Sequence, residues 1–196
     1  MAYGYTRSPK YPSIVVDDRK GAAEVIRYLF SMGHRRIGTV SGPVRSIHTR
    51  ERLLGVQDIF TEQGIPFEKK CVVEGDWRRG SGYRGTDSLL EQKVTAIFCM
   101  SDIMAGGVYD RLGELGLIPG KDISVAGFDD RELSTYYKPP LTTTALPLFE
   151  IGYTACEHAI RKIEGSDCGE EPEELLEIAR SCSLTVRDSV KDIRIR

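Results

Sequence analysis

An arginine, a tryptophan and an aspartate are the residues of this chain best suited to bind a small polar ligand. Arg52 follows a loop that carries Arg45 and Arg50, and we predict that it lies in the first turn of a helix. A positive charge is unfavourable there because the helix dipole is positive at that end, which indicates a partner for Arg52. A solvated basic loop is the alternative explanation, and it suits Arg45 better than Arg52.

Trp77 and Asp129 both stand just beyond predicted strands. Trp77 is the only tryptophan, and its charged neighbours fit a buried core poorly and a stacking platform for a ring-shaped ligand better. Asp129 and Asp130 end a strand together. One of them can cap the following turn, which leaves the other free to accept hydrogen bonds from hydroxyl groups.

A nucleotide-binding fingerprint is a competing interpretation. Gly80–Gly85 reads G-x-G-x-x-G, and Asp102 lies 20 residues beyond Gly82, where a dinucleotide fold places its ribose-binding acid. In that fold the first glycine turns directly off the strand, whereas residues 76–79 intervene here. The order of nucleophile, histidine and acid found in hydrolases is absent too, so we predict no catalytic residues and no cofactor, with an NAD(P)-dependent oxidoreductase as the alternative.

Short apolar runs at regular spacing predict the elements that position these residues. Helical periodicity fills the intervals, and several of these helices end on glycine. Continuous apolar strands are typical of a sheet covered on both faces. The pattern predicts an α/β fold, a doubly wound parallel sheet of about five strands, with ligands at the carboxyl ends of the strands. The runs are Ile14–Val16, Ile37–Val40, Cys71–Val73, Ala96–Met100 and Ile123–Ala126.

The pattern changes beyond Lys138. Two prolines break regular structure. We then predict an extended segment at Leu141–Thr144, a helix from Phe149 to Ile163, a solvated acidic linker at Asp167–Glu177 and a last strand at Cys182–Val186.

The composition excludes several classes of protein. The 196 residues are 40% hydrophobic and 29% charged, with a formal net charge of −2, which excludes a disordered chain, a coiled coil and a surface that grips nucleic acid throughout. No apolar run approaches the roughly 20 residues of a membrane span. The five cysteines lack any C-x-x-C spacing, which indicates free thiols in the cytoplasm rather than disulfides or a metal site.

Ten short motifs in register resemble the effector-binding domain of LacI/GalR-type bacterial transcription regulators. They run from Pro12 to Arg187, and together they are far more specific than any one alone. Among them are Gly33-His34-Arg35-Arg36-Ile37, Arg50-Glu51-Arg52-Leu53-Leu54-Gly55, Glu74-Gly75-Asp76-Trp77, Ser101-Asp102-Ile103-Met104-Ala105 and Val125-Ala126-Gly127-Phe128-Asp129-Asp130.

The resemblance implies a periplasmic binding protein type I-like lobe that senses a small molecule, commonly a sugar or a purine, and of these two we predict a sugar. Arg52 matches the arginine that hydrogen-bonds the effector, Trp77 the aromatic residue that packs on it, and Asp129 the carboxylate that holds its hydroxyls. Ser101 stands where the family has asparagine more often, and His48 lies in the loop that tunes ligand choice. A periplasmic sugar-binding protein shares the fold, but the start of the chain lacks a signal sequence.

The resemblance also implies how the chain is divided. Residues 1–11 are expected to be a tail, 12–138 the C-terminal lobe, 139–165 a strand and helix that return to an absent N-terminal lobe, and 166–196 the linker, last strand and tail. The family binds DNA through an N-terminal helix-turn-helix, which we do not find in this sequence. We therefore expect these residues themselves to make no contact with DNA. We further expect a homodimer, with Leu133–Tyr137 as a candidate interface, and no membrane contact.

Overall fold

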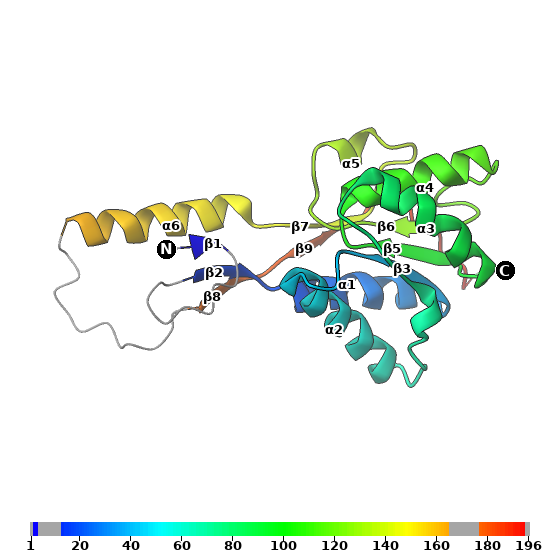
Figure 1. Ribbon diagram of the computed structural model, residues 1–196, viewed down its shortest axis with the longest axis horizontal. Coiled ribbons are helices and arrows are strands. Elements are labelled where there is room, and N and C mark those ends of the chain that lie inside the picture. Colours follow the sequence, from blue (N-terminus) through cyan, green and yellow to red (C-terminus); the bar gives the residue numbers. More distant parts are fainter. Residues whose placement is uncertain (1, 4–12, 165–176, 195–196) are drawn as a thin grey trace. The chain divides into compact units, whose positions relative to one another are not determined.

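The computed structural model describes residues 2–3, 13–164 and 177–194, which form two compact units (Figure 1). One unit comprises Met1–Asp17 and Leu146–Cys182, and the larger comprises Asp18–Ala145 and Ser183–Arg196. The expected N-terminal tail and acidic linker fall almost entirely outside the described residues. The boundaries expected after residues 138 and 165 stay predictions.

The larger unit is built on a parallel sheet, as predicted. Its strands are β3 (Ile37–Ser41), β4 (Val72–Glu74), β5 (Ala96–Cys99) and β6 (Ser124–Ala126), in the order β4-β3-β5-β6. Every residue of β3, β5 and β6 is buried, which explains their continuous apolar runs.

Paired helices cover both faces of this sheet (Figure 1). On one face lie α1 (Asp18–Ser31) and α2 (Ile47–Glu62), and on the other α3 (Arg79–Glu91) and α4 (Asp102–Glu114). The doubly wound arrangement is therefore confirmed, and the loops at the carboxyl ends of the strands meet at one edge.

The first predicted strand belongs to the smaller unit instead. There β2 (Ser13–Val16) pairs in parallel with β1 (Ala2–Tyr3) and with β8 (Glu177–Arg180), so the larger sheet has four strands rather than about five. A continuous apolar run indicates that a strand is buried, but it does not indicate which strands it pairs with. The predicted helix is also here, as α6 (Leu148–Ile163).

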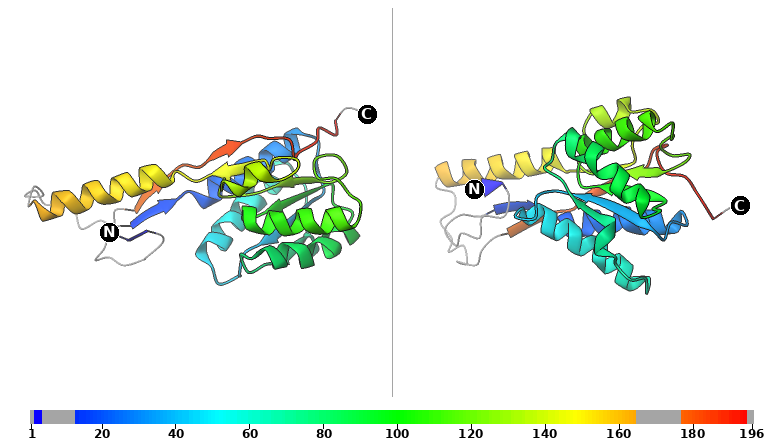
Figure 2. Two further views of the ribbon diagram at one scale, coloured as in Figure 1. Left: turned by 90° about the horizontal axis from the view of Figure 1, so that it is seen from above. Right: turned by 45° about the vertical axis from the view of Figure 1, so that its right-hand side comes forward.

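A short antiparallel ribbon closes the larger unit. It pairs β7 (Thr143–Ala145) with β9 (Ser183–Thr185), which confirms both predicted extended segments (Figure 2). The backbone N–H of Asp129 donates to the carbonyl of Thr144 over 2.9 Å, and this bond fixes the loop after β6 against the ribbon.

The candidate interface segment carries α5 (Leu133–Tyr136). Tyr137 packs within its own unit: its ring lies 5.0 Å from that of Tyr109, and its hydroxyl donates to the carbonyl of Asp102. The side chain of Tyr136 is exposed, and its hydroxyl binds Glu132.

Helix packing accounts for Gly82, the middle glycine of the apparent nucleotide fingerprint. A side chain at Gly82 would overlap the carbonyl oxygen of Met104, and one at Gly107 would overlap that of Arg79. These glycines let α3 and α4 approach closely. The Gly80–Gly85 motif lies at the start of α3, and its Gly82 requires no pyrophosphate to explain it.

Candidate functional site

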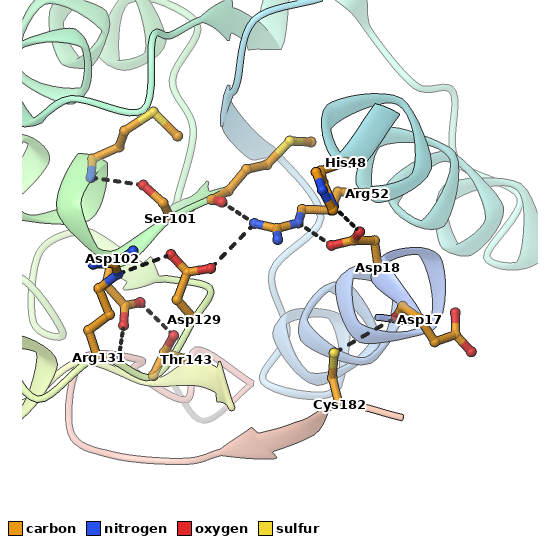
Figure 3. Close-up of polar contacts among 12 residues, drawn as sticks. Asp17, Asp18, His48, Arg52, Ser101, Asp102, Asp129, Arg131, Thr143 and Cys182 are labelled. Atoms are coloured by element: carbon orange, nitrogen blue, oxygen red, sulfur yellow. Dashed lines mark hydrogen bonds and ion pairs between the residues drawn. The ribbon is translucent and has the colours of Figure 1, made fainter. Parts of the chain in front are cut away.

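Arg52 is buried in the larger unit, only 6% exposed, and is held by a carboxylate from α1. Its Nε donates to Oδ1 of Asp18 over 2.7 Å, and Asp18 is fully buried (Figure 3). The prediction that Arg52 lies in the first helical turn is wrong, because α2 begins at Ile47 and places it in the second turn. The partner that the prediction required is nevertheless present.

Asp18 also holds His48, from the first turn of α2. The Nδ1 atom of His48 lies 2.6 Å from Oδ2 of Asp18, so one carboxylate binds two side chains of α2. Asp18 is the first residue of α1, where the helix dipole favours a negative charge. The N-terminal ends of α1 and α2 are thereby joined.

The guanidinium of Arg52 reaches a second acid and two aromatic rings. Its Nη1 donates to the carbonyl of Met100 and lies 3.7 Å from Oδ1 of Asp129. The guanidinium carbon stands 3.7 Å from the centre of the Phe128 ring and 5.7 Å from that of Trp77. Its Nη2 has no hydrogen-bond partner among the described residues, which leaves a donor for a ligand.

The side chain of Trp77 occupies space that is open only because residue 42 is glycine. Its backbone is in the left-handed region at φ 66°, which is unusual for a bulky residue, and its side chain is half-buried. A side chain at Gly42 would overlap the indole ring. The absence of that side chain lets the ring lie against the loop after β3, beside Arg52.

The two aspartates after β6 bind different partners. Asp130 accepts hydrogen bonds from Arg187 over 2.7 Å and from Thr185 over 3.1 Å, which fixes β9 to this loop. Asp129, at φ 113°, instead turns its carboxylate toward Arg52. Burial raises the pKa of Asp129 above the ordinary aspartate value, and the positive charges of Arg52 and Arg131 oppose the shift.

Ser101 and Asp102 build the start of α4. The hydroxyl of Ser101 accepts a bond from the backbone N–H of Met104, so it caps the helix. Asp102 accepts bonds from Thr143 over 2.6 Å and from the N–H of Arg131 over 2.8 Å (Figure 3). Burial raises its pKa to about 7. Ligand contacts at Ser101 and His48 stay predictions.

Sequence reasoning did not select Asp18 or Phe128 as site residues. The signals were weak: Asp18 belongs to an acidic pair after the first apolar run, and Phe128 looks like the end of a buried strand. Arg52, Trp77 and Asp129 come together as expected, with His48 joined through Asp18.

The assembled groups suit recognition of hydroxyl-bearing rings. A buried arginine supplies donors, a carboxylate supplies acceptors, and an aromatic face covers the apolar side of a ring. Within the described residues no cluster of histidine, cysteine and acidic side chains could hold a metal ion. No helix in that part of the chain is long and apolar enough to span a membrane.

The sequence profile of the periplasmic binding protein-like domain matches residues 26–190. Among curated proteins, the HTH-type transcriptional repressor CytR of Escherichia coli K12 is 31% identical over 193 residues, covering 97% of this chain and 55% of CytR. The chain thus spans about half the length of this relative.

Solved structures of LacI family regulators have a similar fold. A sugar-binding transcriptional regulator of the LacI family from Escherichia coli, complexed with phosphate, superposes with a TM-score of 0.84 at 27% identity, covering 97% of this chain and 66% of that one. A LacI family regulator from Enterococcus faecium with bound ribose has a TM-score of 0.83 at 27% identity, covering 93% and 67%.

Proposed function

Because the chain belongs to the periplasmic binding protein-like family, as part of the effector-binding domain of a LacI/GalR-type regulator, we propose that it is the effector-sensing part of a bacterial transcription repressor. The effector is a small molecule bound around Arg52, a sugar rather than a purine. DNA binding belongs to a helix-turn-helix elsewhere in the whole protein, and the protein works in the cytoplasm as a homodimer.

The observation that carries this proposal is the setting of Arg52. A buried guanidinium held between Asp18 and Asp129, with Phe128 and Trp77 beside it, is costly unless its groups are well paired. The two acids fix its orientation and leave Nη2 available. This is a rigid donor prepared before the ligand arrives, which lowers the entropy lost on binding.

The site favours a sugar on chemical grounds. Sugar hydroxyls both donate and accept, so one hydroxyl pair can receive from Arg52 while donating to Asp129. The half-buried indole of Trp77 offers its face to the apolar side of the ring. The ribose complex of the Enterococcus faecium regulator supports the same choice of ligand class.

We propose no catalytic role for these groups. Arg52 is fixed by two carboxylates, and the related proteins are transcriptional regulators. An oxidoreductase built on Gly80–Gly85 is disfavoured, since Gly82, the middle glycine of that motif, serves the contact between α3 and α4.

The proposal is tested by following the fluorescence of Trp77, the only tryptophan, during titration. The ligands are ribose, glucose, cellobiose, adenosine and NADPH. A saturable change with a sugar supports the proposal, whereas a response to NADPH alone restores the oxidoreductase alternative. A response to adenosine alone would support a sensing role but would show that the effector is a nucleoside and not a simple sugar.

A further inference from the structure

A second pocket lies between α2 and the edge strand β4, on a different side of α2 from Arg52. Its volume is about 370 Å³, within the range of small-molecule sites. The residues around Arg52 take no part in it. We call it the α2–β4 pocket, and its lining includes Thr49, Arg50, Leu53, Phe67, Lys69 and Val72.

The walls of the α2–β4 pocket are apolar, and its charged side chains are two cations, Arg50 and Lys69, and one acid, Glu74. Leu53, Phe67 and Val72 are half-buried and form the walls. Lys69 is exposed and makes no ion pair or hydrogen bond within the described part of the chain. The one partner of the Arg50 side chain there is Glu51, at 3.3 Å. A negative group beside Arg50 and Lys69 would therefore meet two cations, while the carboxylate of Glu74 already accepts a hydrogen bond from the backbone N–H of Val44 over 2.8 Å.

Thr49 lines the same pocket and carries an unsatisfied polar group. The residue is 3% exposed, and its hydroxyl oxygen has no hydrogen-bond partner among the described residues. Buried hydroxyls are normally paired, so an unpaired one in a pocket lining indicates a missing ligand or water. A side chain at Gly42 would overlap the Trp77 ring and would also lie close to the Thr49 hydroxyl. The indole ring and this hydroxyl therefore both lie next to Gly42.

We propose that the α2–β4 pocket is a second effector site, for a small hydroxylated aromatic carboxylate. The ring packs among Leu53, Phe67 and Val72, the carboxylate pairs with Lys69 and Arg50, and the hydroxyl binds Thr49. The site is separate from that of the proposed function, so either can stand without the other. Occupancy changes the surroundings of Trp77 through Gly42 and Thr49.

The test is calorimetric titration of 4-hydroxybenzoate into the full chain. We expect saturable binding, weakened about threefold in Lys69→Gln by loss of an exposed ion pair. Thr49→Val keeps the side-chain shape and removes the hydroxyl, so binding weakens about fivefold. Lys70→Gln removes the same charge from the neighbouring residue, which does not line the pocket, and leaves the affinity unchanged.

Methyl-labelled spectra give an independent readout, since 4-hydroxybenzoate should shift the resonances of Leu53 and Val72 and leave those of buried Leu112 in place. The proposal is overturned by the absence of saturable binding at millimolar concentrations. It is equally overturned if Lys69→Gln and Thr49→Val bind as tightly as the wild type, or if Arg52→Gln alone abolishes binding, which assigns the ligand to the other site.

Discussion

Asp18 and Arg52 form a buried ion pair that joins the first residue of α1 to the second turn of α2, with Nε and Oδ1 2.7 Å apart. The same carboxylate binds His48, and the same guanidinium faces Asp129. The donor and acceptor proposed for the effector are thus fixed by one continuous chain of charged contacts. Each link can be tested separately.

Asp18→Asn should lower the free energy of unfolding by about 3 kcal/mol, because it leaves the buried charge of Arg52 without its main partner. Urea denaturation followed by circular dichroism measures the change. The matched control is Asp58→Asn, whose carboxylate is 44% exposed and pairs with Arg19 at 2.6 Å. That exposed pair should contribute less than about 1 kcal/mol. Equal effects of the two substitutions would contradict the structural role given to Asp18.

Asp102 should make the fold less stable as pH rises. Its pKa is raised from 3.8 to about 7 by burial, so the native state binds a proton that the unfolded state has lost between these values. Its stabilising contribution is fully present below pH 3.8 and is lost as pH rises through 7, a change of a few kcal/mol. Urea midpoints across this range should fall more steeply for wild type than for Asp102→Asn. Parallel curves would show that Asp102 titrates normally.

Gly82→Ala should destabilise the chain by about 1–3 kcal/mol, since the added methyl group would overlap the Met104 carbonyl between α3 and α4. The control is Gly113→Ala in α4, where an added methyl group meets nothing. There the higher helix propensity of alanine should add about 0.5–1 kcal/mol. Thermal unfolding distinguishes the two. If Gly82→Ala were as stable as wild type, the packing explanation of the glycine motif would be wrong.

Effector affinity should fall on acidification, with a midpoint above the ordinary pKa of aspartate. The raised pKa of Asp129 means that its carboxylate is protonated at a higher pH than an exposed one, and ionised acceptors make the stronger hydrogen bonds. Titrations of the responding sugar at several pH values measure this. Asp129→Asn should bind more weakly at neutral pH and show a flatter profile. A wild-type affinity that does not change with pH would exclude Asp129 as an ionised acceptor.

Local pattern was sufficient for most elements and for the core of the site. Apolar runs located β3, β5 and β6, and the strand-end rule placed Trp77 and Asp129 beside the same ligand edge. Local pattern could not assign β2 to its sheet, because its partners are β1 and β8, and the latter lies about 160 residues away.

The features that sequence reasoning missed all depend on contacts between distant residues. The partner of Arg52 is Asp18, 34 residues earlier, and a propensity argument finds only that a partner is needed. The role of Gly82 was missed because only the packed helices reveal its contact with Met104.

The proposed function depends most on Arg52, whose buried guanidinium is proposed to hold the effector. The most direct measurement is calorimetric titration of ribose, or of whichever panel sugar changes Trp77 fluorescence, into wild type, Arg52→Gln and Arg45→Gln. Arg45 is an exposed arginine of the preceding loop, so its substitution controls for the loss of one charge. We predict that Arg52→Gln weakens binding at least about tenfold, as expected for loss of a charged hydrogen bond, while Arg45→Gln binds as wild type. Equal affinity in folded Arg52→Gln and wild type would contradict the account.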